Sequence, residues 1–203
     1  MKTLNDFDDK VIVGSDETLK GDTFGGLIVV GFRANNEERE RLRNLGVRDS
    51  KTITDNVILR MAEDLKEYFS NNFFILSLMP EEYNAKVGVF GLTNILNELH
   101  RKVNIELKTS ISIHVVDKYP GCRVGDIIEE KAESKYVEVA AASIIARDEA
   151  IKQFEELSRM ASFRVPKGST HVTEALNFLK RKNLKPAKFV KTHFRNVKNA
   201  LGF

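Results

Sequence analysis

The sequence has few of the features that are typical of disulfide-stabilised or membrane-bound proteins. It contains one cysteine among 203 residues, so no intrachain disulfide can form, and this usage fits a reducing, cytoplasmic location. No uninterrupted apolar stretch is long enough to span a bilayer, and the first residues do not form a secretory signal. We therefore expect a cytoplasmic protein with no membrane partner.

Linkers, repeats and association motifs are also missing. There are no low-complexity tracts and no Ser/Gly/Pro-rich connections, so residues 1–203 are expected to form a single domain. Four scattered histidines and Cys122 do not show the spacing of a zinc site. No heptad pattern calls for association, and we expect a monomer.

Acidic residues are absent from the end of the chain. After Glu174 the basic residues contribute +8 to a net charge of +3, so the first 174 residues carry −5. Two interpretations of this basic helical segment, about 170–203, remain open: a solvated helical surface, or a contact with a polyanion. Apolar residues are interleaved with the charges, so the segment is expected to pack as well. The basic residues are Lys180, Arg181, Lys182, Lys185, Lys188, Lys191, Arg195 and Lys198.

Hydrophobic periodicity predicts early strands followed by alternating helices and strands. Such an order predicts an α/β protein with a mixed sheet and helices on both faces. The expected strands are 10–15, 27–32, 73–79 and 111–116. The expected helices are about 54–69, 93–103, 139–157, 170–179 and 192–201.

Two adjacent acids, Asp16 and Glu17, follow the first apolar run. Adjacent carboxylates at the mouth of a buried strand repel each other and resist desolvation, and a divalent cation is the usual compensation. A solvated turn at the end of a strand is the alternative interpretation.

Two further acids lie where they could join this pair. Asp117 ends another apolar strand, and the carboxyl ends of strands in such sheets gather ligand sites. Glu133 lies 16 residues later, just before a helix rich in small residues. If these acids converge, they could hold two Mg²⁺ or Mn²⁺ ions about 3.5–4 Å apart, as in phosphodiester hydrolysis.

The sequences of several segments resemble those of the type 2 ribonucleases H. The resemblance runs from about Val11 to Leu201. Among these enzymes the chain is most similar to ribonuclease HIII, because the fourth acid is glutamate. The segments that carry the resemblance, in chain order, are 14–17, 21–25, 47–51, 82–84, 116–117, 131–136, 140–147, 166–168 and 192–196.

The resemblance implies a ribonuclease H-like fold with a helical C-terminal region and a hydrolase activity. The expected enzyme is an endonuclease that cuts the RNA strand of an RNA–DNA hybrid by two-metal catalysis, leaving 5′-phosphate and 3′-hydroxyl ends. Asp16, Glu17, Asp117 and Glu133 match the family's catalytic, metal-binding set.

The resemblance also implies substrate-binding residues. Lys20 and Gly21 fall in the segment that reads ribose 2′-hydroxyls in relatives, and these groups distinguish RNA from DNA. Ser50 and Lys51 fall in a motif that holds backbone phosphates. Without the resemblance, the favoured interpretation of residues 49–51 is a capping turn before a helix.

The chain departs from its relatives at three places. Leu19 replaces a glycine, Gly26 stands where proline is usual, and the N-terminal substrate-binding domain common in ribonuclease HIII is not recognisable. Leu19 brings a Cβ to a turn where glycine torsions or a close backbone approach are expected. We therefore expect the basic C-terminal segment to contribute part of the binding affinity for the duplex.

Two other functions remain open. One is nicking at single ribonucleotides in duplex DNA, as ribonuclease HII does. The other is a non-catalytic hybrid-binding module that has kept the fold. Comparing a duplex that contains one ribonucleotide with a full hybrid tests the first possibility, and the second predicts binding without metal-dependent cleavage.

Overall fold

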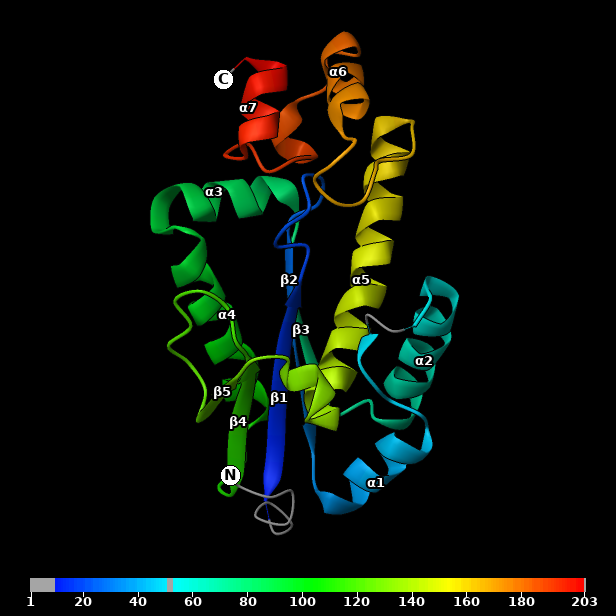
Figure 1. The fold of residues 1–203 in the computed structure, drawn as a ribbon, viewed down its shortest axis with the longest axis vertical. Helices are drawn as coiled ribbons and strands as arrows, with labels where there is room; N and C mark the ends of the chain where they lie inside the picture. Colours follow the sequence, from blue (N-terminus) through cyan, green and yellow to red (C-terminus); the bar gives the residue numbers. More distant parts are fainter. Residues whose placement is uncertain (1–9, 51–52, 203) are drawn as a thin grey trace. The chain divides into compact units, whose positions relative to one another are not determined.

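The computed structural model describes residues 10–50 and 53–202, and it contains a five-stranded sheet with helices packed against it (Figure 1). The strand order is β3-β2-β1-β4-β5. The strands are β1 (Val11–Thr18), β2 (Leu27–Ala34), β3 (Phe73–Leu78), β4 (Ser112–Asp117) and β5 (Ile127–Glu129). The α-helices are α1 (Asn36–Asn44), α2 (Asp55–Tyr68), α3 (Pro80–Phe90), α4 (Leu92–Leu107), α5 (Val137–Ala161), α6 (Thr173–Arg181) and α7 (Arg195–Leu201). Two short 3-10 helices are η3 (Ala132–Ser134) and η4 (Pro186–Lys188).

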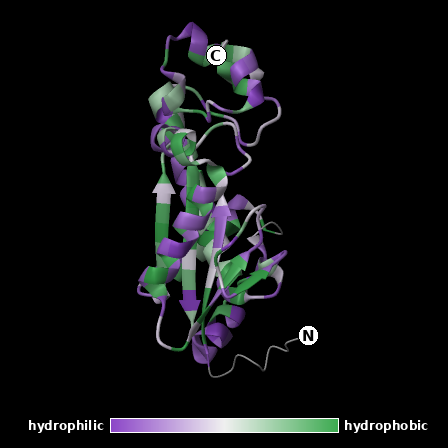
Figure 2. Ribbon diagram, turned by 90° about the vertical axis from the view of Figure 1, so that its left-hand side faces the viewer, coloured by the Kyte–Doolittle hydropathy of each residue, from purple (hydrophilic) through white to green (hydrophobic). Residues whose placement is uncertain are grey.

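The sheet is mixed, as the sequence predicts. β4 is parallel to both β1 and β5, and the strand arrows in Figure 2 point in both directions. The register pairs Ser15 of β1 with Val116 of β4. The predicted end of this strand at residue 15 implied that Asp16 and Glu17 follow it. β1 in fact continues to Thr18, so both acids lie inside the strand.

Two glycines allow helices to approach the sheet from opposite faces. A Cβ on Gly14 of β1 would lie 2.4 Å from the backbone nitrogen of Val139, at the start of α5. A Cβ on Gly31 of β2 would lie 2.8 Å from the side chain of Leu107 in α4. The first turns of α5 and the helix α4 therefore cover different faces of the sheet.

The core of the sheet is formed by its central strands. The β2 residues Ile28, Val29 and Val30 are fully buried, and Val13 of β1 is also inaccessible. Figure 2 shows hydrophobic residues along much of the sheet, while the helices carry both hydrophobic and hydrophilic residues. Such amphipathic helices bury one stripe each against a continuous apolar layer.

Among the described residues the contacts separate into two compact units. The first comprises residues 10–17, 29–50, 53–76 and 93–148, and the second comprises residues 18–28, 77–92 and 149–202. The single domain expected over residues 1–203 remains a prediction.

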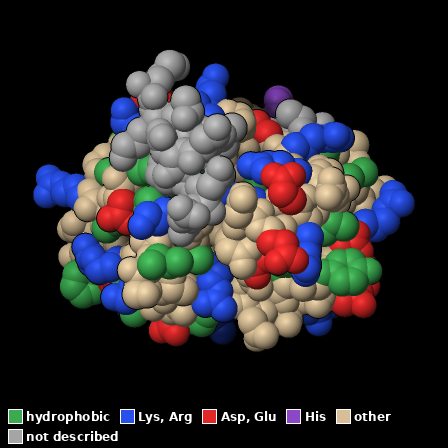
Figure 3. All heavy atoms as spheres, turned by 90° about the horizontal axis from the view of Figure 1, so that it is seen from below, with side chains coloured by type: hydrophobic (Ala, Val, Ile, Leu, Met, Phe, Trp, Pro, Cys, Tyr) green, Lys and Arg blue, Asp and Glu red, His purple; other side chains and the backbone are tan. Residues whose placement is uncertain are grey.

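The helix α1 was not among the predicted elements. It is rich in charged residues, and its N-terminus is closed by a capping box between Asn35 and Glu38. Figure 3 views the end of the molecule where α1 lies in Figure 1, and it shows acidic and basic side chains interspersed. The helix is held by Arg39 and Leu42, the two buried residues on its inner side.

The C-terminal region is helical, as predicted, but one of its charges is not on the surface. α6, η4 and α7 all lie in the second unit. Lys191 is completely buried, so the exposed basic end comprises the other seven positions of that set. No helix among the described residues is both long and apolar enough to cross a membrane.

Candidate active site

Neighbouring strands bring Asp16 and Asp117 together. Ser15 pairs with Val116 in the parallel register of β1 and β4, so the next step along both strands is Asp16 beside Asp117. The carboxylate of Asp117 is one of the charges that act on Asp16. Two residues 101 positions apart therefore lie side by side at the carboxyl ends of two neighbouring strands, as the sequence predicts.

Asp16 is buried in a setting that disfavours its negative charge. Burial, the adjacent carboxylate of Glu17 and that of Asp117 raise the pKa of Asp16 to about 8. A hydrogen bond with the Ser143 hydroxyl and another from the Glu17 backbone N–H (2.8 Å) partly oppose this rise. A nearby cation would remove the remaining cost of ionising the group.

Glu17 points to the other face of the sheet, because successive strand residues alternate in direction. Its Oε2 lies 3.3 Å from Nε2 of His100 in α4. Nδ1 of His100 lies 2.8 Å from the Ser15 hydroxyl, which lies 2.8 Å from Nε2 of His114. A buried polar chain thus runs from Glu17 through His100 and Ser15 to His114. Burial and the neighbouring His100 lower the pKa of His114 to about 4.

Sequence reasoning did not identify this polar chain. A signal was present, because His100 lies on the apolar stripe of α4 that also contains Leu96, Leu99 and Val103. A polar side chain on such a stripe needs a buried partner. The partners of His100, Ser15 and Glu17, are set by the packing of α4 against β1, which is tertiary information.

Glu133 is held next to Asp117 through the backbone. The N–H of Ala132 donates to Oδ1 of Asp117 at 2.8 Å, and Glu133 follows in the short helix η3. Glu133 is buried, with an exposed fraction of 3%. The four predicted acids all lie in the first unit.

The chemistry of this donor set fits a hard divalent cation. Carboxylate oxygens are the ligands that Mg²⁺ and Mn²⁺ prefer. The raised pKa of Asp16 means that its negative charge is disfavoured here, and a bound cation would stabilise that charge. Within residues 10–50 and 53–202, however, no three His, Cys, Asp or Glu side chains already form a ready cage for a metal ion. Oxygens of Asp16 and Asp117 accept hydrogen bonds from backbone N–H groups instead.

Ser50, predicted to bind phosphate, is buried beside this cluster. Its hydroxyl lies 2.9 Å from that of Ser143, the residue that bonds Asp16. Arg147 of α5 fixes the segment by donating to the carbonyls of Ser50 and Ile53 and to Asp55. Lys51, the other predicted phosphate ligand, lies outside the described residues.

A pocket of about 380 Å³ opens beside Glu133 within the first unit. Its lining combines a predicted catalytic residue with basic side chains and with part of the motif that is predicted to bind phosphate. The lining residues are Arg43, Val47, Arg48, Asp49, Glu133, Ser134, Lys135, Tyr136, Val137 and Ala140. The charge of this lining suits an anionic ligand.

Lys20 and Gly21 lie in the second unit, on a turn that begins with Leu19, one of the departures from the relatives. Leu19 has φ of +66°, the left-handed conformation that glycine adopts without strain. Its side chain is nevertheless buried, in contact range of Gly25. Gly21 is exposed, and a Cβ built there would meet no atom within 4 Å.

Gly26, the second departure, is required by its surroundings. A Cβ at this position would lie 2.0 Å from the carbonyl oxygen of Leu78. The Gly26 N–H donates to Oε1 of Gln153 at 2.7 Å, a bond that proline cannot make. Leu78 and Gln153 thus account for glycine in place of proline.

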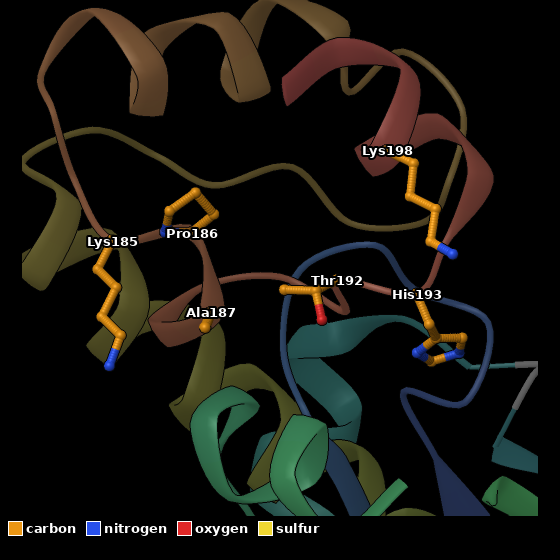
Figure 4. Close-up of a pocket in the computed structure, with 6 residues that line it drawn as sticks. All are labelled: Lys185, Pro186, Ala187, Thr192, His193 and Lys198. Atoms are coloured by element: carbon orange, nitrogen blue, oxygen red, sulfur yellow. The ribbon is translucent and has the colours of Figure 1, made fainter. Parts of the chain in front are cut away.

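Two segments that carry the family resemblance meet in the second unit. Oδ1 of Asn84 accepts hydrogen bonds from the backbone N–H (3.0 Å) and the hydroxyl (3.2 Å) of Thr192. The ring of Tyr83 stacks on that of His193, with centroids 5.8 Å apart. Beside them lies a pocket of about 520 Å³ whose labelled side chains are shown in Figure 4. They are Lys185, Pro186, Ala187, Thr192, His193 and Lys198.

Comparison with known proteins places these features in a family context. The family described as ribonuclease HII matches residues 13–197, a span that includes all four acids. Ribonuclease HIII of Streptococcus pneumoniae is 32% identical over 212 residues, covering 93% of this chain and 72% of the relative.

Solved structures agree with this match. Bst-RNase HIII in complex with Mn²⁺ has a TM-score of 0.84 at 28% identity, covering 95% of this chain and 70% of that one. The RNase HII of Archaeoglobus fulgidus, solved in complex with PCNA, has a TM-score of 0.76 at 27% identity. That match covers 91% of this chain and 95% of the relative.

Proposed function

The chain belongs to the ribonuclease HII/HIII family of ribonuclease H hydrolases, and from this premise we propose that it cuts the RNA strand of RNA–DNA hybrids. The proposed reaction is an endonucleolytic hydrolysis that requires Mg²⁺ or Mn²⁺ and leaves 5′-phosphate and 3′-hydroxyl ends. The observation that carries the proposal is the buried carboxylate of Asp16, whose pKa is raised to about 8 by burial and by the neighbouring carboxylates of Glu17 and Asp117.

The four acids are proposed to hold the metal and so to form the catalytic set. When bound, divalent cations would activate water and offset charge on the scissile phosphate and the leaving 3′ oxygen. The Mn²⁺ complex of Bst-RNase HIII supports this choice of ion. Asp16 and Asp117 present their carboxylates from adjacent strands, whereas Glu17 lies against His100 of α4 and would have to turn towards Asp16 to share its ion.

The substrate-binding residues are proposed on the same basis. Ser143 links Asp16 to Ser50, so the phosphate-binding motif is tied to the acids through one buried side chain. Ser50 and Lys51 would serve the sugar–phosphate backbone. Lys20 and Gly21 would serve the ribose, because the exposed Gly21 can bring its backbone groups to 2′-hydroxyls.

Nicking at single ribonucleotides is the second candidate function. The matching family is described as ribonuclease HII, and the A. fulgidus RNase HII is matched over 95% of its length. The choice between the two substrates therefore belongs in the first experiment.

That experiment is a cleavage assay on four labelled substrates: an RNA–DNA hybrid, single-stranded RNA, DNA duplex, and DNA duplex with one ribonucleotide. Each is incubated with Mg²⁺, Mn²⁺ or a chelator, using wild type and Asp117→Asn. We expect metal-dependent cleavage of the hybrid by wild type and at least a hundredfold loss in the variant. Binding without cleavage in either metal, or equal rates for both proteins, would overturn the proposal.

The role of the Gly21 position can be tested without disturbing the fold. An alanine at Gly21 meets no atom within 4 Å, so Gly21→Ala should leave the melting temperature unchanged. If the backbone there approaches the ribose, the added methyl group should raise KM for the hybrid. Gly88→Ala is the matched control, because Gly88 is also exposed and unhindered. An unchanged KM in Gly21→Ala would remove the residue from the site.

A further inference from the structure

Lys191 is the one lysine among the described residues with no exposed surface, and it lies in the second unit. Its ammonium group donates to two backbone carbonyls, those of Asp22 (2.6 Å) and Gly25 (2.9 Å). It also lies 5.2 Å from the ring centroid of Tyr83 and 5.6 Å from that of Phe194. Burial lowers the pKa of Lys191 to about 7, which shows that this environment disfavours the charge.

The carbonyls that Lys191 binds belong to the turn that follows β1 and contains Lys20 and Gly21. The C-terminal segment holds the base of this turn at other points as well. The N–H of Lys191 donates to the Thr23 carbonyl at 3.0 Å, and the N–H of Gly25 donates to the Phe189 carbonyl at 3.0 Å. Asn196 donates to the Thr23 hydroxyl at 2.8 Å.

The other end of the turn is open. Gly21 is exposed, while Asp22 Oδ1 accepts a hydrogen bond from the N–H of Gly168 at 2.6 Å. The turn is therefore clamped where Asp22 to Gly25 meet the C-terminal segment, and accessible where Lys20 and Gly21 lie. This is the arrangement expected of a loop that presents backbone groups to a ligand in one fixed conformation.

We propose that Lys191 is a positioning residue: by bonding the carbonyls of Asp22 and Gly25, it fixes the turn whose partly exposed Lys20 and exposed Gly21 read the ribose of the RNA strand. This rests on the proposed function, since it assigns the turn to substrate recognition. Without the ammonium group, two buried carbonyls lose their donor and the turn becomes free to adopt other conformations. Lys191 then contributes to selectivity for RNA without touching the substrate.

The test compares Lys191→Met, which fills a similar volume without donors, with Lys191→Gln, which retains N–H donors. Lys86→Met, a half-exposed lysine of α3, is the matched control. We expect Lys191→Met to raise KM for the hybrid about tenfold and to change kcat less than twofold. Lys191→Gln should recover part of the loss, and it also serves if the methionine variant does not fold.

A double-mutant cycle with Gly21→Ala separates a positioning role from a general loss of stability. If both changes act on the same turn, their effects on KM will be less than additive. Additive effects, a fall in kcat and melting temperature with KM unchanged, or an unchanged KM in both variants would each overturn the proposal.

Amide hydrogen exchange provides a measurement that does not depend on cleavage. Exchange of residues 22–25 should be at least tenfold faster in Lys191→Met than in wild type, and unchanged in Lys86→Met. If wild type does not cleave hybrids, the proposed function fails and the ribose role fails with it, while faster exchange would still show that Lys191 fixes the turn. Active wild type with unchanged exchange contradicts the role of Lys191 alone.

Discussion

Asp16 is a single residue whose burial makes stability depend on pH. Its pKa is about 8 in the folded protein, compared with 3.8 as the ordinary value. Between these two values the folded state binds more protons than the unfolded state. Without metal, the free energy of unfolding therefore falls as pH rises through this window.

Replacing Asp16 by asparagine should remove that dependence. In the presence of chelator, we expect Asp16→Asn to melt at a higher temperature than wild type at pH 8, and the difference to shrink towards about pH 4. Melting curves across this range measure it, with the exposed Asp64→Asn as control. A difference between wild type and Asp16→Asn that does not vary with pH would contradict the assignment.

Leu19 combines a backbone cost with a packing gain. The left-handed conformation costs about 1–2 kcal/mol for a residue with a Cβ, and truncating a buried leucine to alanine costs about 2–5 kcal/mol. Leu19→Ala loses packing and keeps the strain, whereas Leu19→Gly loses packing and relieves it. Urea denaturation should rank stability as wild type, then glycine, then alanine. An alanine variant more stable than the glycine variant would contradict the backbone argument.

At the scale of elements, a buried ion pair joins α1 to α5. Nε of Arg39 lies 2.9 Å from Oε1 of Glu138, and the two side chains are 5% and 1% exposed. Burial raises the pKa of Glu138 to about 7, although Arg39 acts to lower it. Removing the arginine would leave a buried carboxylate without its cation.

Arg39→Met is therefore expected to cost about 3–5 kcal/mol of stability. The loss should be smaller at low pH, where Glu138 is protonated. Arg41→Met, which breaks the exposed pair with Glu37, should cost much less. Denaturant titrations of both variants at two pH values provide the comparison, and equal losses would show that burial does not govern this pair.

The elements that sequence could predict are those with a clear hydrophobic period. The apolar runs of β1 to β4 and the amphipathic stripes of α2 and α4 were predicted within a few residues. α1 was missed because its sequence is mostly charged, although Asn35 and Glu38 have the spacing of a capping box. α3 buries only Pro80 and Tyr83, and β5 has three residues, so neither shows a period.

The site was predictable to a similar degree. Strand ends indicated that Asp117 would join the first acidic pair, and the register of β1 with β4 agrees. The contacts of His100 with Ser15 and of Lys191 with residues 22–25 were not predictable. Both link positions at least 85 residues apart, and they arise from tertiary packing that no local pattern records.

For the molecule as a whole, the exposed basic end is expected to contact the backbone of the duplex. Lys180, Lys182 and Lys198 are exposed, unlike Lys191. Replacing all three by alanine should raise KM and flatten the logarithmic salt dependence of binding by about 0.9 for each phosphate that is no longer neutralised. Kinetics at several salt concentrations measure both effects. Lys86, Lys102 and Lys108 provide a matched triple variant, and equal behaviour of the two triples would contradict this role.

The account as a whole depends on a cation offsetting the charge of the clustered carboxylates. The most direct measurement is calorimetric titration of Mn²⁺ into wild type, Asp117→Asn and the control Asp64→Asn. We predict that wild type and the control bind the ion with similar affinity, and that Asp117→Asn binds at least tenfold more weakly. Equal Mn²⁺ affinity in all three proteins would show that the ion, if it binds, does not bind between these strands.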